Sequence, residues 1–400
     1  MRVAVGWILF SWLLTASVAD SASSETAPSM VKPLATTNAP VVSIELPASL
    51  ASSWERLSST LTDALNLQDK QETLPESSYF GADKISNTKK INALLDKVVE
   101  ILVQGDASDL RRQAIALRET GLPALRREVD DLRNKRISAP ETSKVPWVKT
   151  RSQIEARIAE LDVEIKEKER LAMDIDSKIA EALRNMGLDL DDKQIDILLT
   201  SVTGDDLFQN TVVFANVKHV VEKLAELSRE DRDNLEISRR YIGMYLVLND
   251  VLIATQEGLI EKINMDYKPR LAELKAEAEK LRAEALGRAK QGQYSKTQKE
   301  AFEVNAKANA MTARVAELYA ELLEGQRKNF KVTLMDLQRN RDVAESTYKT
   351  VRSTGDLRNL IRAGLDLFDS IHPLSMPQLQ SFENEAIRKE FEEINKRLRK

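Results

Sequence analysis

The sequence predicts an all-α fold, an elongated antiparallel helical bundle with long coiled-coil hairpins, on three observations. Apolar residues recur every three or four positions from about residue 49 to the C-terminus, and the period-two alternation of strands is nearly absent. The 400 residues contain only 13 glycines and 11 prolines, and these cluster, which leaves long stretches free of helix-breaking residues. A hydrophobic fraction of 42% is sufficient for a core and excludes a disordered chain.

Residues 1–19 have the layout of a secretory signal peptide. Arg2 precedes an apolar run from Val3 to Val18, and Ser17-Val18-Ala19 supplies small residues for cleavage. We therefore expect cleavage after Ala19 on export. The alternative is an uncleaved signal anchor that tethers the chain to the inner membrane, because the run has roughly the minimum length that spans a bilayer.

Residues 20–48 are expected to form a Ser/Thr/Pro-rich linker. Four of the eleven prolines lie in this segment, and its apolar residues follow no helical period.

Residues 49–228 are expected to form a helical, coiled-coil region. Its first helices are predicted at 49–70, 83–104, 107–119 and 122–137. Gly105 separates the second helix from the third, and Gly121 with Pro123 separates the third from the fourth. The segment 138–147 is predicted to be the turn between two antiparallel arms.

The second of these arms, 148–186, carries the clearest heptad pattern of the chain. Glu, Lys and Arg fill the positions around its apolar residues, as in a coiled-coil hairpin. The pattern ends at Gly187, a residue typical of the position just past a helix C-terminus. A short helix at 191–202 and a longer one at 205–227 are predicted to follow. The heptad residues are Ile154, Ile158, Leu161, Ile165, Ala172, Ile175, Ile179, Ala182 and Met186.

Residues 229–354 are expected to form a long helical hairpin. Its helices are predicted at 229–289 and 296–352, joined by Lys290 to Ser295, and Pro269 is expected to kink the first. The stretch 241–265 is apolar on several faces, which predicts burial among several neighbours. Asn249 and Asp250 interrupt it and argue against membrane insertion.

Residues 355–400 are predicted to form short C-terminal helices around a proline-broken connector. Their apolar side chains either fold back on the bundle or dock on another protein, and both alternatives are kept open. The candidate docking residues are Leu374, Met376, Leu379, Phe382, Ile387 and Phe391.

Searches for catalytic and metal-binding motifs give little. The absence of cysteine excludes disulfides, thiolate metal sites and cysteine nucleophiles, and two histidines exclude a histidine-rich metal site. Ser-x-x-Lys occurs at Ser86–Lys89 and Ser346–Lys349, but its companion motifs Ser-Asp-Asn and Lys-Thr-Gly are missing. The acidic group at residues 189–192 lacks the glycine and glutamate of a calcium loop. We therefore expect no enzymatic activity, no cofactor and no metal.

These features predict a function based on contacts between proteins. A net charge of −4 gives no electrostatic case for nucleic acid, and no segment after the signal peptide has the length of a membrane span. We expect an exported, periplasmic scaffold or accessory component of a bacterial cell envelope that binds other envelope proteins and is compatible with homo-oligomerisation. The alternative is a secreted helical effector, or a protein like a pore-forming toxin, that rearranges on membranes.

Overall fold

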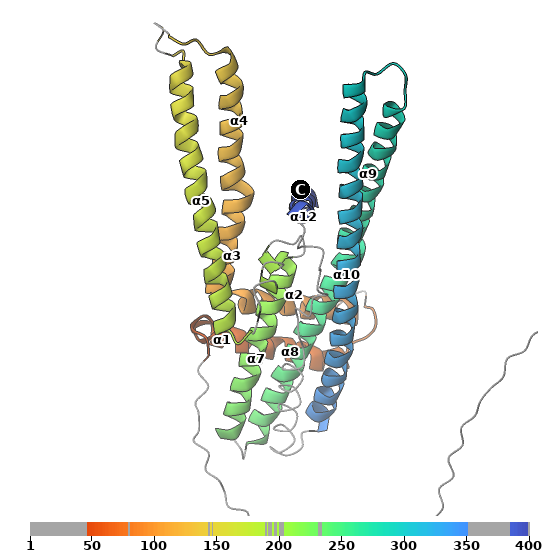
Figure 1. The fold of residues 1–400 in the computed structure, drawn as a ribbon. Coiled ribbons are helices and arrows are strands. Elements are labelled where there is room, and N and C mark those ends of the chain that lie inside the picture. Colours follow the sequence, from red (N-terminus) through yellow and green to blue (C-terminus); the bar gives the residue numbers. More distant parts are fainter. Residues whose placement is uncertain are drawn as a thin grey trace, which may run out of the picture. The chain divides into compact units, whose positions relative to one another are not determined.

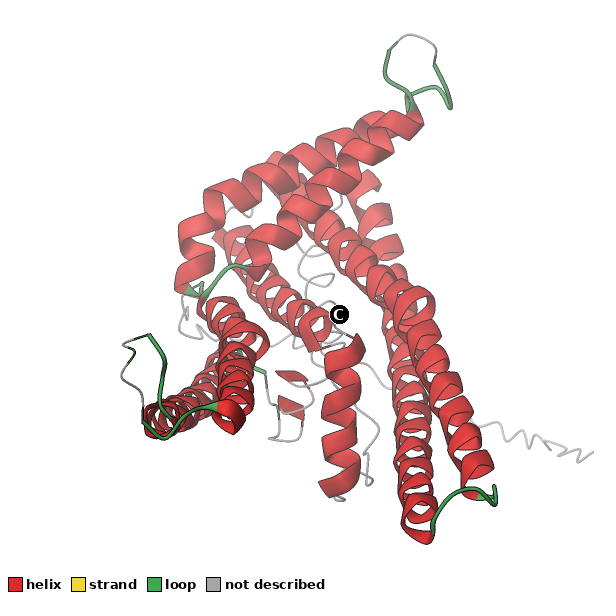
Figure 2. Cartoon of the chain, turned by 90° about the horizontal axis from the view of Figure 1, so that it is seen from above, coloured by secondary structure: helices red, strands yellow, loops and turns green. Residues whose placement is uncertain are grey.

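The computed structural model describes residues 46–350 and 385–398, with gaps at 79–80, 143–144, 146, 189, 191–193, 196–197, 200–203 and 231–233. The predicted signal peptide, nearly all of the predicted linker and most of the C-terminal segment lie outside the described residues. In the described part every regular element is a helix and there is no strand, which confirms the all-α class (Figure 2). The elongation of the bundle and the coiled-coil geometry of its hairpins stay predictions.

Figure 1 shows the arrangement of the helices, whose positions in the sequence agree closely with those predicted from the apolar periodicity. Most ends fall within three residues of the predicted ones, and the largest differences lie around Pro123, before Leu235 and around Pro269. The described elements are α1 (Ala48–Gln71), α2 (Lys84–Val103), α3 (Asp106–Ile115), η1 (Ala116–Gly121), α4 (Leu122–Ser138), α5 (Arg151–Asn185), α7 (Gly204–Glu230), α8 (Leu235–Lys262), η2 (Ile263–Tyr267), α9 (Lys268–Ala289), α10 (Lys296–Thr350) and α12 (Glu385–Leu398).

The two irregularities predicted at prolines, near Pro123 and at Pro269, both coincide with a π-helical turn. The expected break at Gly121 and Pro123 is absent, because the π-helical turn η1 joins α3 directly to α4. In the same way η2 joins α8 to α9, and Pro269 follows it in the first turn of α9. A proline in the first turn of a helix needs no backbone donor, and a π-turn is a known way to accommodate a local irregularity. The predicted helix 229–289 also begins later than expected, at Leu235.

The helices α9 and α10 pack against each other as an antiparallel pair, joined by a turn at residues 290–295 as predicted (Figure 1). Lys268 pairs with Glu324 at 2.8 Å and Lys275 with Glu317 at 3.1 Å. Seven residues forward along α9 thus correspond to seven backward along α10. Buried alanines spaced by seven lie on both helices, and such small side chains permit close packing. They are Ala278, Ala285, Ala306 and Ala313.

The helices α4 and α5 form a second antiparallel pair. Arg126 of α4 pairs with Glu169 of α5 at 2.8 Å, and Arg136 near the end of α4 reaches Glu155 near the start of α5 at 3.8 Å. Most of the heptad residues of α5 are buried, as their spacing predicts, where α5 packs against α3 and α4. The buried ones are Ile154, Ile158, Leu161, Ala172, Ile175 and Ile179.

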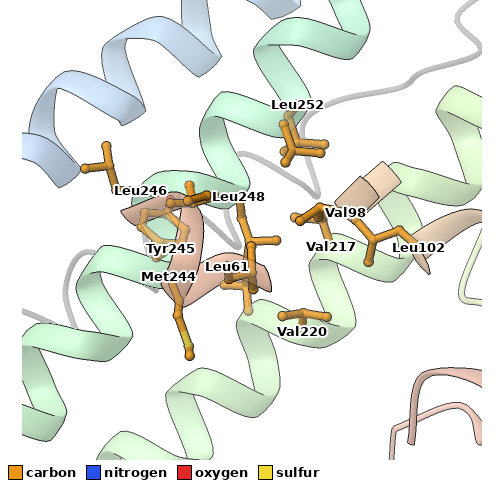
Figure 3. Close-up of a cluster of buried hydrophobic side chains, with 14 of the residues drawn as sticks. Leu61, Val98, Leu102, Val217, Val220, Met244, Tyr245, Leu246, Leu248 and Leu252 are labelled. Atoms are coloured by element: carbon orange, nitrogen blue, oxygen red, sulfur yellow. The ribbon is translucent and has the colours of Figure 1, made fainter. Parts of the chain in front are cut away.

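The central core is built around α8. Leu61 of α1, Val98 of α2 and Val217 of α7 gather around Leu248 of α8 (Figure 3). The prediction that the stretch 241–265 is core is confirmed for its first half by the burial of Ile242, Met244–Leu248, Val251 and Leu252, whereas Met265 at its end is 74% exposed. Among the described helices, none combines the length and apolarity that crossing a membrane requires.

Candidate functional site

The residues predicted to dock a partner lie only partly within the described chain. Four of them lie outside it, namely Leu374, Met376, Leu379 and Phe382. Ile387 lies in helix α12. Phe391 is buried, and its ring lies 4.3 Å from that of Tyr319 on α10. The protein's own core thus covers this residue, which favours the fold-back alternative over docking.

Two further contacts attach α12 to α10. The hydroxyl of Tyr319 donates to Oδ1 of Asn395 at 2.8 Å, and the hydroxyl of Thr312 donates to Oε1 of Glu390 at 2.6 Å. Ile394 and Leu398 are buried in the same cluster as Phe391. The described end of the chain is therefore part of the packed protein.

The first Ser-x-x-Lys motif has a structural task. Asp83 caps α2 by accepting from the backbone N–H of Ser86 at 2.7 Å, and the hydroxyl of Ser86 accepts from the backbone N–H of Asp83 at 3.1 Å. This reciprocal capping occupies the hydroxyl that the motif would use as a nucleophile. The hydrogen bonds from Ser86 lower the pKa of Asp83.

The second motif lies beside a polar cleft of about 570 Å³ between α1, α2, α8 and α10. Asp250 of α8 lies in the cleft wall with only 14% of its side chain exposed. Its carboxylate accepts from Nε of Arg341 on α10 at 2.7 Å and from Nε2 of Gln68 on α1 at 2.7 Å. One carboxylate thus joins three helices.

The chain of ion pairs continues along α10 and returns to α1. Arg341 also pairs with Glu345, one turn further on. Lys349 pairs with Glu345 at 2.9 Å and with Glu72, just after the end of α1, at 2.8 Å. These five charged groups of the cleft wall are therefore partners of one another.

Tyr348 forms a parallel link across the same cleft. Its hydroxyl donates to Oδ2 of Asp69 at 2.8 Å, and the guanidinium of Arg239 lies 5.0 Å from the centre of its ring. The second contact has the geometry of a cation–π interaction. Through these two contacts Tyr348 of α10 is joined to α1 and to α8.

The pKa shifts in the cleft have identifiable causes. Burial raises the pKa of Asp250, and the charge of Arg341 opposes this effect. Hydrogen bonds to Glu72 and Glu345 raise the pKa of Lys349, and the hydrogen bond from Lys349 lowers the pKa of Glu345. Burial, followed by the hydrogen bond to Asp69, raises the pKa of Tyr348. A lysine nucleophile instead requires a pKa lowered toward the working pH, and that of Lys349 is shifted the opposite way.

A second buried cation, Arg111, is also paired with a carboxylate of another helix. Arg111 of α3 is 4% exposed, donates to Oδ1 of Asp205 at 2.6 Å and donates to the backbone carbonyl of Leu199 at 2.9 Å. It also lies 6.0 Å from the ring centre of Phe208. This cluster attaches α3 to the start of α7.

No metal centre is visible in the described part of the chain, where no group of three or more histidine, aspartate or glutamate side chains is placed to hold an ion. Asp250 is visible in the sequence as an interruption of the apolar stretch, but its partners are not. An acidic residue inside the most apolar helix is the signal that predicts a buried counter-charge, whereas Gln68 and Arg341 carry no local signal.

Comparisons with known proteins identify no family or relative, so the protein is described by its fold and its cleft. No family model, no curated protein and no solved structure matches the chain. The described residues define an all-helical protein whose helices are fastened together by paired charges around a polar cleft.

Proposed function

We propose that this protein is a non-enzymatic, exported component of a bacterial cell envelope, with a structural or scaffolding role in the periplasm and contacts to other envelope proteins. The observation that carries the proposal is the pairing of the cleft's charges across α1, α8 and α10. These groups hold helices in place.

The direction of the pKa shift of Lys349 supports a structural use of the cleft. The ammonium of Lys349 is held charged by Glu72 and Glu345, and this protonated state is neither a base nor a nucleophile. Burial raises the pKa of Asp250, but its carboxylate accepts hydrogen bonds from Arg341 and Gln68. The stability of the junction depends on all of these partners together.

Export rests on the N-terminal sequence, where an apolar run ends at a small-residue cleavage site. The alternative of a secreted effector that rearranges on membranes requires an apolar hairpin that leaves the core. The candidate segment is α8, and its apolar residues are packed against α1, α2 and α7. Its release would expose this whole surface to water, so the scaffold is the better supported proposal.

The compartment is tested by cysteine labelling, because the chain has no cysteine of its own. Met173→Cys places a thiol at a side chain that is 71% exposed on α5. In cells with a permeabilised outer membrane, a membrane-impermeant maleimide should label this variant while the inner membrane is intact. Val251→Cys, at a fully buried position, is the matched control and should react only after unfolding. Labelling of Met173→Cys only after lysis of the inner membrane would overturn export.

The scaffold role is tested by photo-crosslinking in the same cells. A photoreactive residue at Val332 or Val343, both more than half exposed on α10, should give discrete crosslinked species with envelope proteins. Release of the protein into the medium with no crosslinked species would favour the secreted effector.

A further inference from the structure

The turn between α4 and α5 carries an unusual group of exposed apolar side chains. Ile137 and Trp147 are each 84% exposed, and Val145 and Val148 are 39% and 38% exposed. We call these four residues the apolar tip. They lie at or beside the connection between the two helices, where the pair ends (Figure 1).

The apolar tip is not an unfinished part of the protein's own core. The seam between α4 and α5 is already closed by buried side chains of both helices, namely Val129, Leu132, Ile154, Ile158 and Leu161. Trp54, the other tryptophan of the described residues, packs against the central core. Trp147 is therefore exposed to water, whereas Trp54 is packed on the core. A group of exposed apolar side chains of this kind indicates an interaction site.

The apolar tip lies in a stretch with an excess of basic residues, in a protein of negative net charge. From Arg133 to Arg151 the sequence contains six basic residues and one acidic residue, Glu141. Several of these bases pair with acids further along the helices: Lys135 with Asp131, Arg133 with Asp130, and Arg136 and Arg151 with Glu155. When these acids are included, the end of the hairpin still carries two more basic than acidic residues. Lys149, next to Val148, is exposed.

The turn between α9 and α10 shows that this arrangement is not a general property of the molecule's helix connections. Its aromatic residue, Tyr294, packs edge-on against Phe302 with 4.9 Å between ring centres. The two residues cover each other, and no tryptophan lies in that turn.

We propose that the apolar tip is a docking site for a membrane surface rich in anionic phospholipid. Trp147 and Ile137 enter the headgroup region, and Lys149 with its basic neighbours lies against the lipid phosphates. The choice of lipid over a protein partner rests on charge and shape. Tryptophan with adjacent cations is the typical composition of an interfacial anchor, and a turn at the end of a helix pair enters a fluid surface without a matching pocket.

The proposed contact is peripheral and reversible. Four apolar residues are far fewer than a membrane span requires, so attraction between the bases and the anionic lipid must contribute. Attachment should therefore weaken as salt screens the charges. This role is independent of the scaffold proposal, because it concerns the α4–α5 turn and not the cleft.

An environment-sensitive fluorophore on a single cysteine tests the proposal in the full-length chain. Val148→Cys carries the probe at the apolar tip, and Met173→Cys carries it at an exposed position of the same helix pair away from the turn. With phosphatidylglycerol vesicles, the Val148→Cys probe should shift to the blue, whereas with phosphatidylcholine vesicles or at high salt it should not. The Met173→Cys probe should stay unchanged in every case. Because the readout is local, vesicle binding through the N-terminal apolar run does not imitate it.

The double substitution Ile137→Ser with Trp147→Ser should weaken vesicle binding of the Val148→Cys probe by more than about tenfold. Val304→Ser, at a 62% exposed position of the other hairpin, should leave it unchanged. An unresponsive Val148→Cys probe, or an equal response from Met173→Cys, would overturn the proposal. If the apolar tip binds only a protein partner, the Val148→Cys probe will not respond to the vesicles.

Discussion

Nε of Arg341 donates to Oδ1 of Asp250 at 2.7 Å, and this hydrogen-bonded ion pair joins α10 to the most apolar helix of the protein. The two residues are 91 positions apart in the sequence. Because burial disfavours the charged carboxylate of Asp250, its ionised form depends on the guanidinium beside it.

This dependence predicts unequal effects of removing the two partners. Arg341→Met leaves the buried carboxylate of Asp250 with Gln68 alone and should lower the free energy of unfolding by about 2–4 kcal/mol. Asp250→Asn leaves Arg341 with Glu345 and should cost less, about 1 kcal/mol. Urea unfolding measures both. Arg339→Met, at a side chain 74% exposed on the same helix, should stay within about 0.5 kcal/mol of wild type. Equal losses for Arg341→Met and Arg339→Met would contradict the prediction.

The pH dependence of stability should reveal Glu324. Hydrogen bonds from Arg327 and Lys268 lower the pKa of Glu324 from 4.5 to about 2. A folded-state pKa below the unfolded value stabilises the protein above about pH 4.5, and this contribution is lost as the pH falls toward 2. Glu324→Gln should therefore melt below wild type at pH 7, with a difference that shrinks between pH 4.5 and 2.

Asp250 provides a comparison of opposite sign. Its pKa is raised from 3.8 by burial, so ionisation on going above pH 3.8 costs the folded state stability. The melting temperature of Asp250→Asn relative to wild type should rise with pH in that range. A parallel pH profile for Glu324→Gln and Asp250→Asn would show that these assignments are wrong.

Two glycines of α8 should respond to alanine with opposite signs. A Cβ at Gly243 would lie 2.2 Å from Cδ2 of Leu65 and 3.1 Å from the ring of Tyr348, and Leu65 is packed in the central core. Gly243→Ala should therefore destabilise the protein by about 1–3 kcal/mol. Gly258 has no such neighbour within 4 Å, so Gly258→Ala should stabilise the helix by about 0.5–1 kcal/mol. Chemical unfolding of the two variants decides the prediction, and equal effects would refute it.

The sequence predicts the helices of this fold well because each helix buries its own periodic face. The heptad residues of α5 and the apolar run around Leu246 are visible without any knowledge of their partners. The π-turns before Pro123 and Pro269 are not, because the apolar period continues through them and only the backbone records the extra residue.

The cleft was largely hidden from sequence reasoning for a different reason. Gln68, Asp250 and Arg341 come from three helices far apart in the chain, and Gln68 and Arg341 each resemble an ordinary helix-surface residue in their local context. Asp250 alone stands out, since it interrupts an apolar run. The apolar tip was similarly visible only as a turn, because the exposure of Trp147 depends on how the seam between α4 and α5 closes.

The last prediction concerns the C-terminal helix. The ring of Phe391 packs on Tyr319, and Ile394 and Leu398 are buried with it, so α12 contributes to the stability of the region around α10. Phe391→Ala should lower the free energy of unfolding by about 3 kcal/mol, and Tyr319→Phe, which removes the hydrogen bond to Asn395, by about 1 kcal/mol. Val332→Ala, at an exposed position of α10, is the control and should have little effect. If α12 instead serves as a detachable docking element, Phe391→Ala will melt like wild type and lose only its crosslinks to an envelope partner. Thermal unfolding together with crosslinking in cells therefore separates the two roles, because the fold-back role requires the loss of stability and the docking role forbids it.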